Sequence, residues 1–248
     1  MSPAAAPAER DKQRAGPADM QWSWIPQNWT IIWQYTLDNA LLGLLPPLLG
    51  LVISVPVGIA CVAWGWLYPP VLSLSSAIYA LPSLALFVVL IAYTGLGNLT
   101  VIIPLTLFSL CVLIRNVVDG LRSVPEPVRQ AATAMGFTQV RRLVQVELPL
   151  AVPVIIAGLR VAVVSSISLA SVGQLIGVSS LGYFFIDGLQ RDFPTEIYAG
   201  LALTILLALL CDLILVLARR LLTPWARGRQ IAPSRQTPLI PGPLVGAR

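Results

Sequence analysis

The chain has 248 residues, of which 56% are hydrophobic and only 11% are charged, and its formal net charge is +5. Soluble domains carry about 25% charged residues. The apolar runs of this chain are too long for core helices, so the composition predicts an all-α integral membrane protein with several spans. The same run lengths disfavour a soluble all-α protein.

The chain begins with an Ala- and Pro-rich stretch of mixed charge, residues 1–20, which predicts a disordered tail without a cleaved signal peptide. The stretch MQWSWIPQNWTIIWQY follows at residues 20–35. Its aromatic side chains favour the headgroup level of a membrane, so we expect an interfacial helix that leads into the first span. A plain aromatic-rich loop is the alternative.

Five apolar runs predict about five transmembrane helices, because each is near the 20 or so residues that a span requires. They cover residues 41–67, 71–93, 101–114, 148–178 and 197–218. Pro46, Pro47 and Pro56 interrupt the first run and predict a helix that is kinked or starts late. The transmembrane domain therefore occupies residues 21–222, and the Pro-rich basic residues 223–248 predict a second disordered tail.

The charged residues between the runs predict the orientation of the chain. Cationic loops next to spans mark the cytoplasmic side. Arginines cluster in the segment between the third and fourth runs and again after the fifth: Arg115, Arg122, Arg129, Arg141, Arg142, Arg219, Arg220, Arg227, Arg229, Arg235 and Arg248. The acidic loop between the fourth and fifth runs is expected outside. The N-terminus is then outside and the C-terminus cytoplasmic, and the charge reflects topology rather than nucleic-acid binding.

Two charges lie inside the spans. Arg160 follows Pro149 in the fourth run, and Asp212 precedes Arg219 in the fifth, which puts both roughly 10 to 17 Å from the inner surface. Charges at that depth tend to pair or to face a cavity. We expect Arg160 and Asp212 to face the bundle interior and to stabilise it, together or separately. Alternatively, each side chain reaches the inner surface alone.

The chemistry of a catalytic site is missing from the sequence. The chain has no histidine, which removes the commonest general base and zinc ligand. It has no glycine-rich phosphate loop that ends in Gly-Lys-Ser/Thr. Its three cysteines sit in apolar runs and are typical of buried residues. These observations predict no metal site, no catalytic residues and a transport or scaffold protein.

A polar stretch, QAATAMGFTQVRRLVQVELP at residues 130–149, separates the third and fourth runs. Its pattern predicts two short helices, with a turn at Gly136 and Pro149 in the first turn of the fourth span. The two apolar faces comprise Val128, Ala131, Ala132 and Met135, and then Val140, Leu143 and Val144. A small basic knob of this kind suits a groove in another protein. An amphipathic loop on lipid headgroups is the alternative.

The spacing of this stretch resembles a motif of bacterial ABC importer permeases: Glu-Ala-Ala, three residues, Gly, nine residues, Ile, one residue, Leu-Pro. The matching residues are Gln130, Ala131, Ala132, Gly136, Val146, Leu148 and Pro149. Gln130 replaces the glutamate and Val146 the isoleucine. The resemblance implies that residues 125–149 form the coupling helix, which docks into a cleft of the ATPase subunit, within the type I permease fold.

Four further segments resemble the permeases of osmoprotectant importers, which carry glycine betaine, choline or carnitine. They are ALPSLALFVVL at 80–90, GLGN at 95–98, IRN at 114–116 and VELPLAVPVIIAGLRVA at 146–162. IGVSSLG at 176–182 departs from that subfamily's more glycine-rich version.

The resemblance implies a multi-pass protein of the bacterial inner membrane. Its partners would be ATPase subunits, which hold the ATP-Mg, a second permease chain and an extracytoplasmic binding protein. This chain would bind no cofactor. Two alternatives stay open: the same architecture for another small solute such as an amino acid, and a membrane scaffold or channel subunit without ATPase coupling.

Overall fold

The computed structural model describes residues 23–223, and every regular element in that range is a helix. The longer helices are α3 (Trp29–Ala63), α4 (Tyr68–Tyr79), α5 (Ser83–Thr94), α6 (Asn98–Arg122), α9 (Leu148–Val172) and α11 (Pro194–Leu222). The shorter ones are α2 (Trp24–Gln27), η1 (Gly65–Leu67), α7 (Glu126–Ala134), α8 (Gln139–Arg142), η2 (Leu143–Glu147), η3 (Gly173–Ile176) and α10 (Gly182–Gln190).

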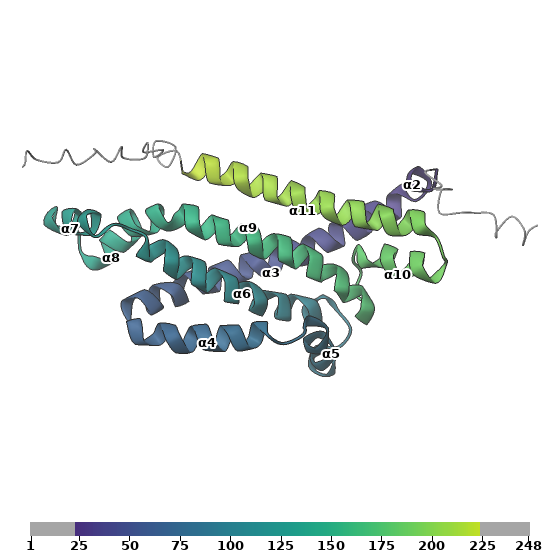
Figure 1. Cartoon of the computed structure of the whole chain (residues 1–248), viewed down its shortest axis with the longest axis horizontal. Coiled ribbons are helices and arrows are strands. Elements are labelled where there is room, and N and C mark those ends of the chain that lie inside the picture. The colour runs from purple at the N-terminus through teal and green to yellow at the C-terminus, as the bar shows by residue number, and fades with distance from the viewer. Residues whose placement is uncertain (1–22, 224–248) are drawn as a thin grey trace, which may run out of the picture.

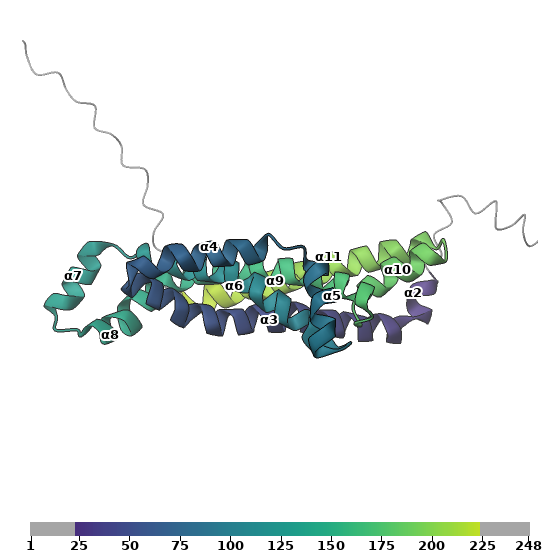
Figure 2. The same ribbon diagram turned by 90° about the horizontal axis from the view of Figure 1, so that it is seen from below.

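The long helices form an elongated bundle. Helices α3, α6, α9 and α11 run along the long axis, and α4 lies beside α6 (Figures 1 and 2). Helices α7 and α8 project from one end of the bundle, whereas α2 and α10 lie at the opposite end (Figure 1). We call these the α7/α8 end and the α10 end.

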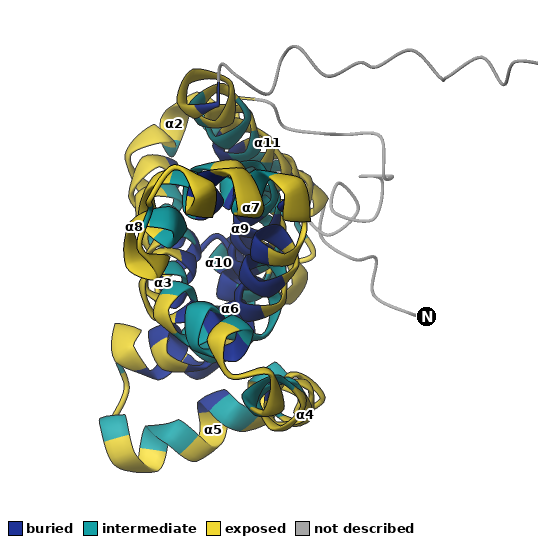
Figure 3. Cartoon of the chain, turned by 90° about the vertical axis from the view of Figure 1, so that its left-hand side faces the viewer, coloured by how far each residue is buried: buried dark blue, intermediate teal, exposed yellow. Residues whose placement is uncertain are grey.

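The core lies between α3, α6 and α9. Viewed from the α7/α8 end, the buried surfaces face the middle of the bundle and the outer faces are exposed (Figure 3). Most of the fully buried side chains of α6 are aliphatic, and Val101, Leu105, Leu113, Val117 and Leu121 are among them. The absence of a side chain at Gly58 lets α3 approach α6 closely. A Cβ atom at this position would collide with the side chain of Val117.

The outer face of α11 is apolar and exposed. Its exposed leucines and isoleucines include Leu206, Leu209, Leu210, Leu213 and Ile214. Exposed apolar surface over a whole helix is normal where lipid or another membrane subunit covers it. Within residues 23–223, four helices are long and apolar enough to cross a membrane, and the number becomes five if α4 and α5 are taken as one broken span.

The second predicted span, residues 71–93, is not one continuous helix. Helices α4 and α5 meet at a bend of 90°. Pro82 sits at the bend in an extended conformation, with ψ 127°, and a proline disfavours helical geometry in the residue before it. The second apolar run therefore forms two helices that are separated at Pro82.

The first span does not start late. Helix α3 begins at Trp29 and runs through Pro46, Pro47 and Pro56. Its early turns are fixed by side-chain packing: the ring of Tyr35 stacks on that of Tyr183 at 4.6 Å between centroids. Within the aromatic stretch, residues 24–27 form the short helix α2, and α3 begins two residues later at Trp29. Boundaries elsewhere also extend beyond the apolar runs, and the shortest run became the 25-residue α6.

The two predicted tails, residues 1–20 and 223–248, lie outside the described residues except for Thr223. The same holds for the cytoplasmic arginines predicted beyond Arg220.

Candidate functional site

The polar stretch between α6 and α9 folds into α7, a turn, α8 and η2, as two short helices connected at Gly136. Gly136 has φ +84°, a conformation that glycine adopts without strain. Its N–H donates to the carbonyl of Thr133 at 3.0 Å, and the N–H of Phe137 donates to that of Ala132 at 3.2 Å. This pair of bonds is the Schellman arrangement, which satisfies the last carbonyls of a helix. The turn predicted at Gly136 is therefore present.

The second short helix starts at Thr138, whose hydroxyl accepts a hydrogen bond from the N–H of Arg141 at 3.4 Å. After α8, residues 143–147 adopt a π-helical turn and lead without a break into α9 at Leu148. Pro149 lies in the first turn of α9, where its missing N–H costs nothing. The segment is thus one continuous backbone with the bundle helix.

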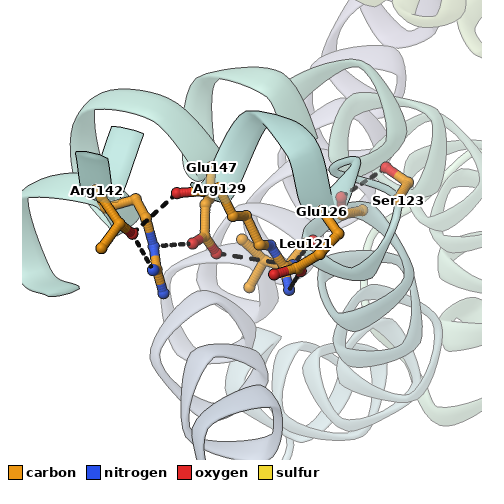
Figure 4. A network of polar contacts seen from close by, with 8 residues as sticks. Leu121, Ser123, Glu126, Arg129, Arg142 and Glu147 are labelled. Carbon is orange, nitrogen blue, oxygen red and sulfur yellow. Dashed lines mark hydrogen bonds and ion pairs between the residues drawn. The ribbon is translucent and has the colours of Figure 1, made fainter. Parts of the chain in front are cut away.

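A buried carboxylate ties the segment to the bundle. Glu147 is 5% exposed. Its carboxylate lies 2.8 Å from Nε of Arg142 and 3.8 Å from Nη2 of Arg129 (Figure 4). Arg129 also donates to the carbonyl of Leu121 at 2.7 Å, and Arg142 to the hydroxyl of Thr133 at 3.0 Å. One carboxylate therefore links α6, α7, α8 and the start of α9.

Sequence reasoning missed this cluster. It treated Arg129 and Arg142 as topology signals and Glu147 as a spacer within the Val-x-Leu-Pro motif. The available signal was that Glu147 is a lone acid that follows an arginine-rich stretch and directly precedes an apolar helix, a position where an unpaired charge is costly.

The motif residues fall into two groups. Gln130, Ala131 and Gly136 are exposed on the projecting part, whereas Val146, Leu148 and Pro149 are half-buried where α9 begins. Ala132 is buried, at 1% exposed, because it packs inward against its own chain. Ala132 therefore does not share an exposed apolar face with Ala131, as the helical pattern had predicted. The exposed apolar residues of the tip are instead Met135 and Val140, at 70% and 73% exposed.

The two charges predicted within the spans meet each other. Arg160 of α9 donates through Nε to Oδ1 of Asp212 at 2.6 Å and through Nη2 to Oδ2 at 2.7 Å. This bidentate geometry is the strong form of an ion pair. The side chains are 32% and 27% exposed in the isolated chain, so the pair lies between α9 and α11 and not at a helix end.

The chain matches the family model described as binding-protein-dependent transport system inner membrane component over residues 50–228. The glycine betaine/carnitine/choline transport system permease protein OpuCD of Bacillus subtilis is 34% identical over 217 residues, covering 86% of this chain and 95% of that protein. The osmoprotectant import permease protein OsmW of Salmonella typhimurium is also 34% identical, covering 71% and 84%.

Among solved structures, the MetNI methionine ABC transporter in inward-facing conformations matches with a TM-score of 0.70 and 23% identity, covering 80% of this chain and 98% of that one. This likeness concerns the fold, which is that of an ABC importer permease. Together with the family match and the two relatives, it shows that this chain belongs to the family of binding-protein-dependent transport system inner membrane components.

Proposed function

We propose that this chain lines the membrane path of an ATP-driven importer for an osmoprotectant such as glycine betaine, choline or carnitine. One observation carries the proposal: the relative named for transport of these three solutes matches over nearly its whole length, at 95% coverage and 34% identity. A second relative is named for osmoprotectant import. Glycine betaine, choline and carnitine are all small polar solutes that carry a quaternary ammonium group.

The projecting segment of residues 125–149 is the part of this chain that docks on the ATPase. Its exposed tip carries Met135 and Val140 next to the exposed Arg141, a mixture of apolar and basic surface that suits a cleft in another protein. The basic residues around it favour the cytoplasmic side. The α10 end then faces the outside and receives the solute from a binding protein.

Three kinds of partner follow. A second permease chain, identical or paralogous, completes the path, two ATPase subunits hold the ATP-Mg, and the extracytoplasmic binding protein delivers solute. The catalytic chemistry resides in the ATPase, so this chain acts mechanically. Because η2 runs directly into α9, a displacement of α7 and α8 is transmitted to a bundle helix through continuous backbone and the Glu147 cluster.

The test is uptake by proteoliposomes that contain this chain, its partner ATPase and its partner binding protein. We expect ATP-dependent uptake of labelled glycine betaine or choline, and none with an ATPase that cannot hydrolyse ATP. An assembled complex that hydrolyses ATP and imports an amino acid, but neither quaternary ammonium solute, contradicts the solute assignment and retains the importer assignment.

A further inference from the structure

A half-open pocket lined by several polar side chains lies between α4 and α6. It has a volume of about 300 Å³, enough for a small solute. Its polar lining residues are Ser75, Ser76, Tyr79, Cys111, Arg115 and Asn116. Such a lining is unexpected between two helices that are otherwise apolar, because polar side chains within a membrane typically face an interior path.

Arg115 is the charge of this cavity. It lies within α6, seven residues before Arg122 at the helix end, which corresponds to roughly 10 Å along the axis. Within residues 23–223, no ion-pair or hydrogen-bond partner is found for its guanidinium. Arg160, the other arginine inside a span, is fully engaged with Asp212. Arg115 is exposed, and a cation that lacks a partner and lines a pocket is available to an anionic group of a ligand.

The same pocket is also lined by an aromatic ring. Tyr79, at the end of α4, is 57% exposed, and its ring packs edge-on against that of Phe108 with centroids 5.9 Å apart. Tyr79 also lines a second, small cavity between α6 and α9, together with Ser109, Ser165 and Ser166. The two cavities share Tyr79 and Val112, so they adjoin. Aromatic faces attract quaternary ammonium groups.

We propose that this cavity is a transit site for small zwitterions that carry a carboxylate and a quaternary ammonium group, with the carboxylate at Arg115 and the ammonium at Tyr79. The guanidinium of Arg115 is complementary to the carboxylate of a betaine, and the ring of Tyr79 is complementary to its ammonium group. Choline has the ammonium but no carboxylate, so it makes only the aromatic contact. The proposal rests on the proposed function, because the site is argued for a solute that passes through this chain.

The test compares uptake of labelled glycine betaine with uptake of labelled choline by the reconstituted complex, with the binding protein unchanged throughout. The variant is Arg115→Gln, the conservative variant is Arg115→Lys, and the control is Arg122→Gln, which removes an arginine from the end of the same helix. Arg122 lies over the ring of Tyr68, at 4.6 Å from its centroid, outside the cavity. The readout is the ratio of the two uptake rates, which cancels any effect on assembly or ATPase coupling.

We expect Arg115→Gln to lower the betaine-to-choline ratio about tenfold, the size expected for one charge-assisted hydrogen bond. Arg115→Lys restores much of the ratio, and Arg122→Gln leaves it unchanged. An unchanged ratio in Arg115→Gln overturns the site and is the result expected if Arg115 only reaches towards lipid headgroups. A wild-type complex that imports choline but not glycine betaine also overturns the site. A wild-type complex that imports neither solute overturns the proposed function itself.

Cys111 provides a second, independent readout. It lines the cavity, and its thiol donates to the carbonyl of Ser75 at 2.9 Å, whereas Cys61 and Cys211 are buried. A methanethiosulfonate reagent that bears a trimethylammonium group should modify Cys111 in the working complex, and glycine betaine should slow the reaction. Cys111→Ser removes the labelling. A Cys111 that stays unmodified during turnover shows that no aqueous cavity opens there and overturns the proposal.

Discussion

The ion pair between Arg160 and Asp212 makes the sharpest energetic prediction of this fold. Its two hydrogen bonds, at 2.6 and 2.7 Å, join α9 to α11. Helix α11 otherwise presents mostly exposed apolar residues, which gain little from packing where lipid is the alternative neighbour. Polar contacts should therefore carry an unusual share of the α9–α11 attachment.

The loss in free energy of unfolding is set by the unpaired charge that a single substitution leaves between α9 and α11. Arg160→Met leaves the carboxylate of Asp212 without its partner, and Asp212→Asn leaves the guanidinium without its counter-charge. Breaking a fully buried pair in this way costs about 3–5 kcal/mol. Because each side chain is about a third exposed in the isolated chain, we expect about 2 kcal/mol for each single change. The double variant should cost about 2 kcal/mol as well, which gives a coupling energy of about 2 kcal/mol.

The assay is reversible unfolding of the purified chain in mixed micelles, with the four members of the cycle compared under identical conditions. The matched control is the ion pair between Asp187 and Arg191. It also joins a carboxylate to a guanidinium, but the side chain of Arg191 is 58% exposed. Its coupling should stay below about 1 kcal/mol. Additive effects for Arg160→Met and Asp212→Asn, within about 0.5 kcal/mol, would refute a direct interaction between the two side chains.

Three further predictions concern topology, the buried carboxylate and helix packing. In a background without native cysteines, an impermeant thiol reagent applied from outside should label a cysteine at Gln190 and miss one at Thr138; the reverse pattern contradicts the orientation. Glu147→Gln should lower the free energy of unfolding by about 2 kcal/mol and speed proteolysis between α7 and α9, whereas unchanged proteolysis would show that the carboxylate does not hold the segment. Gly58→Ala should destabilise the fold by about 1–3 kcal/mol, because the new Cβ atom collides with a side chain of α6. The control Gly65→Ala should not destabilise it, because Gly65 faces open space. Equal melting temperatures for the two variants contradict the close approach of α3 and α6.

Sequence patterns predicted the helical class and the position of the projecting segment, because run length and motif spacing are local properties. They did not predict that α4 and α5 diverge by 90° at Pro82, since a proline within an apolar run is compatible with a kink or with a break. The extension of α3 back to Trp29 was missed for a related reason: hydropathy stops at the polar residues near Asn39. The structure keeps them helical through tertiary contacts, and the side chain of Asn39 donates to the carbonyl of Ile167 at 3.3 Å.

The candidate site shows the same division. The turn at Gly136 was predictable, since its chemistry is local. The meeting of Arg129, Arg142 and Glu147 was not predicted, because it depends on how α7 folds back towards the start of α9. Likewise, Arg115 was interpreted as a topology signal, and only the neighbouring α4 reveals that it lines a cavity.

The central claim is that the segment of residues 125–149 transmits ATPase motion to the bundle, and Gly136 gives the most direct access to it. At φ +84° a leucine is strained by about 1–2 kcal/mol, and its side chain enters open space at the exposed tip, where a partner would sit. Gly65→Leu is the control, because Gly65 is an exposed glycine at the same end of the bundle that also faces open space.

The measurement is ATP hydrolysis by the reconstituted complex, with and without solute-loaded binding protein. In Gly136→Leu complexes that contain all subunits, we expect the stimulation by loaded binding protein to disappear, while Gly65→Leu complexes retain it. Stimulation at the wild-type level in assembled Gly136→Leu complexes would contradict the assignment of this segment as the coupling element.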